Sequence, residues 1–183
     1  MQLVSYISKN ILIFKIYKMK KYAIIILIFG TNLASCQKTQ PEKMIEQFVI
    51  DLFDDEIQPQ KIVDSYLEIK PDNENSLSIS EGKKGALGII DKARNGESKE
   101  LGWLVPNYEI KNIQKPQIFS LKKYGDLDTL GIKFYTKYID NIYVLLDSEK
   151  KKILQYFLLN ETNNKIVSFS LFIKSDQAWF FVY

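Results

Sequence analysis

The stretch Lys165-Ile166-Val167-Ser168-Phe169-Ser170-Leu171-Phe172-Ile173 decides the fold class of this 183-residue chain. Apolar residues occupy every second position from 167 to 173, which predicts a β-strand with one buried face. Runs of the same period fill most of the second half of the chain and are separated by turn-forming residues. We therefore expect strands at 108–120 (interrupted near Pro116), 130–138, 141–146, 153–160, 165–173 and 178–183.

The first half of the chain after residue 43 has helical periodicity instead. Its first helix carries apolar residues at three- and four-residue spacing, with acidic and amide side chains between them. Pro59 suits the first turn of a second helix, which Pro71 and the following residues would end. The apolar positions are Met44, Ile45, Phe48, Val49, Leu52 and Phe53 in the first helix, and Ile62, Val63, Tyr66, Leu67 and Ile69 in the second.

A third helix is predicted by its two ends. Ser78 followed by Glu81 forms the pattern of a capping box, and Asn95-Gly96 provides a stop signal. Glycines at 82, 85 and 88 lie three residues apart within this helix. They indicate either close backbone packing or a frayed helix.

Helices followed by antiparallel strands predict an α+β domain, with N-terminal helices packed on a curved sheet of four to six strands. We find no repeat and no second domain, so residues 44–183 form one domain. This order of elements resembles the nuclear transport factor 2-like (cystatin-like) cone superfamily. The resemblance implies either a pocket between helices and sheet or a dimer interface on the outer sheet face.

The C-terminal strands are apolar on both faces, whereas a sheet covered by helices on one side alternates apolar and polar residues. The second face therefore needs a homodimer partner, another protein, or a ligand in a pocket. The alternative is a strongly coiled sheet whose two faces are both internal. The residues that we expect to line such a pocket or interface are Tyr135, Tyr143, Tyr156 and Trp179.

Residues 19–36 have the features of an export signal. Basic residues at 20 and 21 precede an apolar segment from Tyr22 to Phe29, which is shorter than the 20 or so residues of a membrane-spanning helix. The segment ends in Leu33-Ala34-Ser35-Cys36, which resembles the lipobox of bacterial lipoproteins. The resemblance implies cleavage before Cys36 and attachment of lipid, including an acyl chain such as palmitate, to that cysteine. Two or more acyl chains make membrane anchoring stable.

This assignment divides the chain into a signal peptide at 1–35, with Met19 as an alternative start, and a lipidated cysteine with its tether at 36–43. The composition, rich in Lys, Ile and Asn, resembles that of Bacteroidetes lipoproteins. Surface-exported members of that group often carry an acidic cluster after the cysteine, and residues 37–40 lack one. We therefore expect a lipid-anchored protein of the cell envelope that faces the periplasm.

Processing also changes the charge. Residues 1–35 contain five lysines and no acidic residue, so the remaining 148 residues have 20 basic and 22 acidic side chains and a net charge of −2. Such a balance does not favour nucleic-acid binding, which needs concentrated positive charge.

The chain contains no histidine and only one cysteine, which excludes Ser-His-Asp catalysis, histidine-bound zinc and an internal disulfide. We expect no cofactor and no metal.

Three short patterns resemble functional motifs. The acidic group Asp51, Asp54, Asp55 and Glu56 lacks the glycine of a calcium loop, and indicates a solvated helix face. Ser80-Glu81-Gly82-Lys83 matches a Ser-x-x-Lys pattern without its usual companion motifs. Asp128-Thr129-Leu130 is similar to the O-glycosylation acceptor of the Bacteroidetes, which makes Thr129 a candidate acceptor.

These observations favour a non-catalytic, membrane-anchored protein that binds a partner protein or a small apolar ligand. Two alternatives remain: a cone-fold enzyme that uses carboxylates and tyrosines for acid–base chemistry, and an inhibitor or immunity-type protein.

Overall fold

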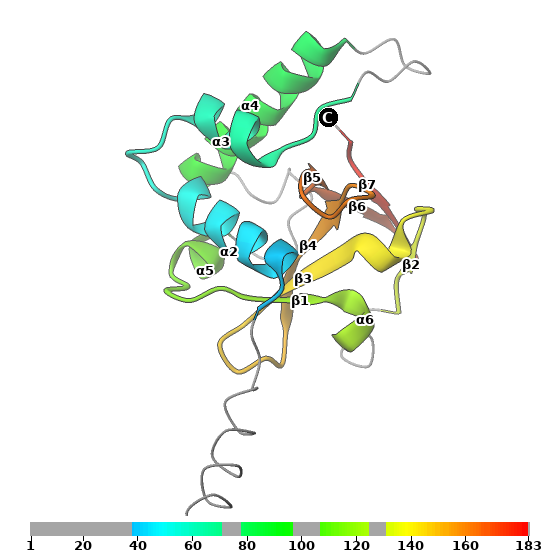
Figure 1. Cartoon of the computed structure of the whole chain (residues 1–183). Coiled ribbons are helices and arrows are strands. Elements are labelled where there is room, and N and C mark those ends of the chain that lie inside the picture. The colour runs from blue at the N-terminus through cyan, green and yellow to red at the C-terminus, as the bar shows by residue number, and fades with distance from the viewer. Residues whose placement is uncertain (1–37, 71–77, 97–106, 125–130, 183) are drawn as a thin grey trace, which may run out of the picture. The chain divides into compact units, whose positions relative to one another are not determined.

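The computed structural model describes residues 38–70, 78–96, 107–124 and 131–182, and residues Thr39–Tyr183 group into one compact unit. The fold class is α+β: helices come first and two sheets follow (Figure 1). The longer helices are α2 (Gln40–Leu52), α3 (Pro59–Tyr66) and α4 (Ile79–Asn95), and the short ones are α5 (Asn107–Lys111) and α6 (Leu121–Tyr124). None of the helices in the described ranges has the length and apolarity to cross a bilayer.

The strands form a four-stranded antiparallel sheet and a three-stranded mixed sheet. The larger sheet has the order β1-β3-β4-β5, and the smaller has the order β2-β7-β6, with β2 parallel to β7. The strand bounds are β1 (Gln117–Ser120), β2 (Lys133–Phe134), β3 (Ile142–Leu146), β4 (Ile153–Leu159), β5 (Ile166–Ser168), β6 (Leu171–Lys174) and β7 (Gln177–Phe180).

The four-stranded sheet lies between two hydrophobic cores. On one face, residues of α2, α3, α4 and α5 pack against alternate residues of β1, β3 and β4, with Phe48 and Phe157 among the largest fully buried side chains. On the other face, the intervening residues pack against the three-stranded sheet, with Tyr156 at the centre. The protein therefore has three layers: helices, large sheet and small sheet.

The middle layer explains why the strands are apolar on both faces. Every residue of β3 and of β4 is buried. Both faces of these two strands are therefore internal, which is one of the two alternatives that the sequence left open. The helices cover one face, and the second sheet covers the other. The four-stranded sheet fits the expected four to six strands, and the other three strands form a second sheet that the sequence did not indicate.

The break between the two sheets lies at Phe169-Ser170, inside the stretch that the sequence presents as one strand. The Ser168 hydroxyl donates to the Ser170 carbonyl at 3.0 Å and accepts from the Ser170 N–H at 3.2 Å. The fully buried Gln155 of β4 donates to the Phe169 carbonyl at 2.7 Å. Local side-chain hydrogen bonds of this kind offer the backbone an alternative to the sheet ladder, so the chain bends here and enters the second sheet as β6.

The helices begin and end largely as expected. The Ser78–Glu81 capping box starts α4, and Gly96 ends it with a φ of 90°. Helix α2 begins at Gln40, four residues earlier than the apolar pattern predicts, because Thr39 and Glu42 form a second capping box. Helix α3 ends at Tyr66, before Ile69.

Three other expectations are corrected. Residues 107–111 form helix α5 rather than the start of a strand, with Ile110 buried in the helix-side core. The expected strand at 130–138 is reduced to Lys133–Phe134. A methyl group added at Gly85 or Gly88 would meet no atom within 4 Å, so close packing does not explain these glycines, and α4 is continuous through them.

Candidate functional site

The outer face of the three-stranded sheet carries a row of aromatic side chains. The strand register places Trp179 of β7 beside Phe172 of β6, and Tyr135, just after β2, lies on the other side of Trp179. The Tyr135 and Trp179 rings are stacked, with centroids 5.2 Å apart and planes 17° apart. The Phe172 and Trp179 centroids are 6.1 Å apart. The three rings therefore form one aromatic row across the sheet.

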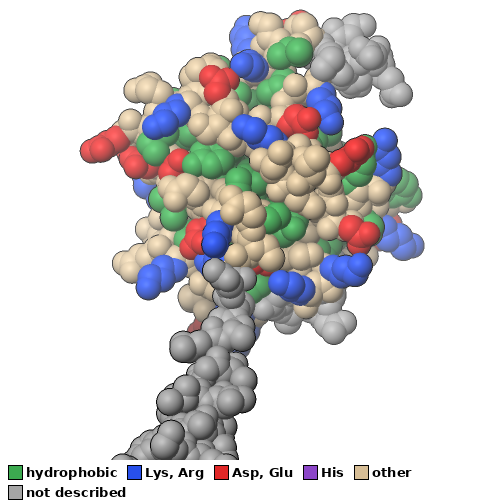
Figure 2. Space-filling view, viewed as in Figure 1, with side chains coloured by type: hydrophobic (Ala, Val, Ile, Leu, Met, Phe, Trp, Pro, Cys, Tyr) green, Lys and Arg blue, Asp and Glu red, His purple; other side chains and the backbone are tan. Residues whose placement is uncertain are grey.

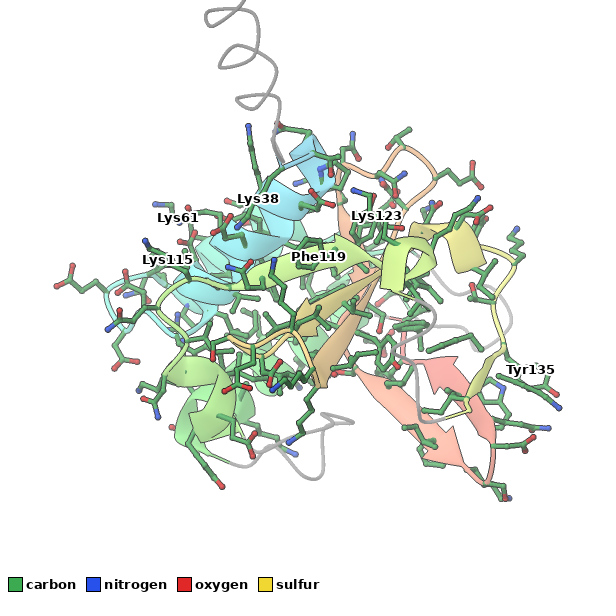
Figure 3. The ribbon with its side chains drawn as sticks, turned by 90° about the horizontal axis from the view of Figure 1, so that it is seen from below. Lys38, Lys61, Lys115, Phe119, Lys123 and Tyr135 are labelled. Carbon is green, nitrogen blue, oxygen red and sulfur yellow. The ribbon has the colours of Figure 1, made fainter. Side chains whose placement is uncertain are left out.

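This row is open to solvent. Tyr135 is 55% exposed and Phe172 is 62% exposed, and Phe181 and Val182, just after β7, are exposed as well. Large apolar groups that gather on one face, rather than lying singly, are a feature of interaction surfaces. In Figure 3, Tyr135 projects outward beside the strands of the small sheet, away from the helix side on which Lys61 lies. We call Tyr135, Phe172, Trp179 and Phe181 the aromatic face.

A basic row runs next to the aromatic row. Lys133 of β2 and Lys174 of β6 both pair with Gln177 of β7, two residues along the strands from the aromatic residues. Because side chains on one sheet face recur every second residue, Lys133 and Lys174 share the outer face with the aromatic row. The Asp176 carboxylate lies 3.5 Å from the Lys133 ammonium group. Both side chains are well exposed, so this ion pair neutralises the positive charge of the row only in part.

The chain builds this face with a tight hairpin. Ser175 and Asp176 connect β6 to β7, with Ser175 at a φ of 58°. The Tyr135 N–H donates to the Ala178 carbonyl at 2.8 Å, and the Lys133 N–H donates to the Asp176 carbonyl at 2.8 Å. These two bonds hold β2 in register with β7 and so align Tyr135 with Trp179.

Two of the four residues expected to line a site lie together, and two lie elsewhere. Tyr135 and Trp179 form the aromatic row. Tyr156 is fully buried between the two sheets, where it contacts Phe134 with ring centroids 5.1 Å apart. Tyr143 points to the other side of the large sheet, into the helix-side core. The four therefore do not line one pocket, because neighbouring strands of the large sheet send Tyr143 and Tyr156 to opposite faces.

Tyr143 lies close to the one acidic side chain that is buried among the described residues. Glu42 is 4% exposed, accepts from the Thr39 N–H at 2.8 Å, and has Lys123 at 3.4 Å. Burial and the nearby Glu42 carboxylate raise the pKa of Tyr143. Both Glu42 oxygens have partners within the fold, which fits a structural role in holding the first turn of α2.

A small cleft adjoins the aromatic face. Its volume is about 250 Å³, and Tyr135 and Val182 belong to both its wall and the exposed region. A larger hollow of about 640 Å³ lies between α5 and the turn after β3, and has many polar side chains, among them Glu109, Asn112, Gln114 and Lys152. One lysine and one acidic residue of this hollow form an ion pair, since Lys152 lies 3.3 Å from Glu109; Lys115 and Asp147 also line it.

The remaining sequence patterns have structural partners or lie outside the described residues. Asp51 accepts from Tyr66, and Lys83 pairs with Asp64 at 2.9 Å. No group of three or more acidic side chains in the described ranges is arranged to hold a metal ion. The face drawn in Figure 2 mixes lysines with acidic side chains. Cys36 and Thr129 lie outside the described residues.

Sequence reasoning identified Tyr135 and Trp179 but missed Phe172, which it placed on one face of a single long strand. The separate Leu171–Lys174 strand depends on the Ser168–Ser170 bend, and serine at both positions was the one signal available for it. Comparisons of the chain with protein-family models, with curated proteins and with solved structures found no match.

Proposed function

We propose that this chain is a lipid-anchored, non-catalytic protein of the bacterial cell envelope that binds a partner protein through the aromatic face. The lipobox pattern at 33–36 supports the anchor. The observation that carries the binding proposal is the row of Tyr135, Trp179 and Phe172, in which Tyr135 and Phe172 are exposed and Trp179 is half-buried. Tyrosine and tryptophan are among the residues that contribute most energy to protein interfaces.

The length of the tether argues against a membrane surface as the occupant of this face. A chain lipidated at Cys36 enters α2 at Gln40, and four residues span at most about 14 Å. The aromatic face lies on the far side of both sheets from the helix layer. Packed layers are about 10 Å apart, so the face is at least about 20 Å from α2. The anchor is therefore too short for the aromatic face to contact the bilayer, and the face is available to a partner in the periplasm.

Charge argues against a second copy of the chain. Two copies facing each other across a two-fold axis that runs along the strands would bring the row containing Lys133 and Lys174 close to its own equivalent, and like charges across an interface are unfavourable. A partner with an apolar patch bordered by acidic side chains matches both rows. We therefore assign the face to an acidic partner protein.

The anchor is tested on the full chain in cells. Cys36→Ser would move the protein from the membrane fraction to the soluble fraction and abolish labelling by an alkyne analogue of palmitate. Retention of both label and membrane association in this variant would refute lipidation at Cys36.

The binding face is tested by photo-crosslinking in the same cells. A photo-reactive amino acid in place of Tyr135 would give one discrete product with a second protein. The matched control is Tyr108 on α5, which is 63% exposed and lies on a helix that packs in the helix-side core. The product must disappear when Lys133→Glu and Lys174→Glu are added, because the partner is held in part by charge.

Each other outcome counts against the proposal. A product of twice the chain's own mass would assign the face to a second copy, and light scattering of the purified chain would then show a dimer. Equal crosslinking at 135 and 108, or none at 135, would show that the aromatic face is not a docking surface.

A further inference from the structure

The cleft beside the aromatic face opens at one end of the core between the two sheets. Leu158 of β4, Val167 of β5, and Phe180 and Val182 at the end of β7 supply its apolar walls. Val167, Phe180 and Tyr138 also pack against the inter-sheet core, so the cleft continues that core towards solvent. Its inner surface is hydrophobic, and an apolar group placed there would be shielded from water on several sides.

The polar side chains at the rim are nearly all committed to partners within the protein. Glu161 accepts from the Tyr138 hydroxyl at 2.8 Å, and Lys70 pairs with Glu68 at 3.3 Å. The Asn160 side chain belongs to a turn, in which it bonds to Asn164 at 2.8 Å. These groups stabilise the walls of the cleft and have little capacity left for a ligand.

Lys137 differs from these groups because its partner is an aromatic side chain and not a carboxylate. Its Nζ lies 4.8 Å from the centre of the Tyr138 ring, and no carboxylate of the described residues lies within 4.0 Å of it. A hydrogen bond with the Tyr138 side chain, and to a lesser degree the Glu161 carboxylate, raise the pKa of Lys137, so its charge is retained at neutral pH. The rim thus presents a cation without a carboxylate partner in the described part of the chain.

The volume limits the size of a ligand. A cleft of about 250 Å³ holds roughly eight groups of the size of a water molecule, which occupies about 30 Å³ in the liquid. We infer that the cleft is a binding site for a small apolar carboxylic acid of about eight carbon atoms, with its chain against Phe180 and Val182 and its carboxylate at Lys137. This inference does not rest on the proposed partner protein, because the cleft shares only Tyr135 with the aromatic row.

The first experiment is a chain-length series on residues Gln37–Tyr183, which contain both hydrophobic cores. Butanoate, hexanoate, octanoate and decanoate are titrated by calorimetry, after circular dichroism has shown that the protein is folded. Affinity is expected to rise about fourfold for each added methylene up to octanoate and to change little beyond it, where the cleft is full. A lack of saturable binding, or a rise that continues unchanged to decanoate, would overturn the site.

Variants then locate the two parts of the ligand. Lys137→Gln is expected to weaken octanoate binding about tenfold and to leave the binding of the uncharged octan-1-ol unchanged. Lys84→Gln, at an exposed position of α4, is the matched control and should alter neither. Val182→Trp fills the cleft and should abolish binding of both compounds.

Two results would contradict the assignment. Equal binding of octanoate and octan-1-ol, unaffected by Lys137→Gln, would show that the lysine does not hold an anion. Binding that survives Val182→Trp would place the ligand elsewhere on the protein.

Discussion

Tyr135 and Trp179 stack with their ring centroids 5.2 Å apart on the sheet face that points away from both hydrophobic cores. The contact brings together the end of one short strand and the middle of another, and neither strand belongs to the large sheet. A stacked pair in this position contributes little to the protein interior and a great deal to the shape of the surface. Loss of this pair should therefore lower the free energy of unfolding by less than loss of a core tyrosine does.

Tyr135→Ala and Tyr156→Ala make that comparison directly. Tyr135 is mostly exposed, so its truncation should lower the free energy of unfolding by about 1 kcal/mol, the value of an aromatic pair. Tyr156 is fully buried, and its truncation should cost about 4 kcal/mol. Urea denaturation of both variants measures the difference. Equal losses would mean that the outer face is as important to stability as the inter-sheet core.

Arg94, the sole arginine of the sequence, should be one of the most sensitive positions of the helix layer. From α4 it donates to four backbone carbonyls at the end of α2 and in the following loop: Leu52 at 2.7 Å, Asp54 at 2.8 Å, Ile57 at 2.9 Å and Asp51 at 3.2 Å. The last carbonyls of a helix have no partner within it. Arg94→Ala should cost about 3 kcal/mol, as measured by urea denaturation.

Arg94→Lys separates geometry from charge, because an ammonium group cannot reach these carbonyls in the forked arrangement of a guanidinium. We expect it to lose about 2 kcal/mol. The control is Lys92→Ala on the exposed side of the same helix, which should change stability by less than about 0.5 kcal/mol. Full retention of stability in Arg94→Lys would show that charge alone is needed.

Gly88 within α4 and Gly96 at its C-terminal end should respond to alanine in opposite directions. Gly88 lies within the helix with open space around it, so Gly88→Ala should stabilise the protein by about 0.5–1 kcal/mol. Gly96 has a φ of 90°, which is unfavourable for a residue with a Cβ atom, so Gly96→Ala should destabilise it by about 1 kcal/mol. Thermal unfolding of both variants tests the pair, and changes of the same sign would contradict this account.

Stability at high pH should depend on Tyr66. Burial and then the hydrogen bond to Asp51 raise the pKa of Tyr66 well above its usual value of about 10. The folded state therefore keeps a proton that the unfolded state releases. The stabilisation is complete below about pH 10 and is lost as the pH rises further.

Tyr66→Phe cannot titrate, so the stability advantage of the wild type over this variant should shrink above pH 10. The slope is at most about 1.4 kcal/mol per pH unit, and solvent screening reduces it because Tyr66 is partly exposed. Urea denaturation between pH 8 and 11 gives both curves. A constant difference across this range would show that Tyr66 does not couple to pH.

The parts of the fold that sequence patterns predicted are those decided by local interactions. The Ser78–Glu81 capping box and Gly96 define α4, and Pro59 starts α3. Both signals act within one helical turn, so they can be read without knowledge of the rest of the molecule. The continuous apolar pattern of β4 likewise leaves little choice but a buried strand.

The parts that were missed depend on distant contacts. Residues 107–111 form α5, and the helix is stabilised by Ile110, which is buried in the core beneath the helices. The bend at Phe169 is held by Gln155 from a neighbouring strand, which no local pattern reveals. The aromatic face follows from that bend, whereas Tyr143 and Tyr156 belong to the large sheet and point to its two opposite faces.

The segment that forms β4 also affects the behaviour of the unfolded chain. Its sequence Ile153–Leu159 has seven consecutive residues without charge or proline, all buried in the native protein. Exposed in an unfolded chain, such a segment has the composition that assembles into cross-β aggregates. Lys150, Lys151 and Lys152 directly precede it, and charged residues beside an aggregation-prone strand oppose its self-assembly. The three lysines are exposed in the folded protein and add nothing to its core. Their contribution is to the unfolded chain, in which they oppose aggregation through the segment that later becomes β4.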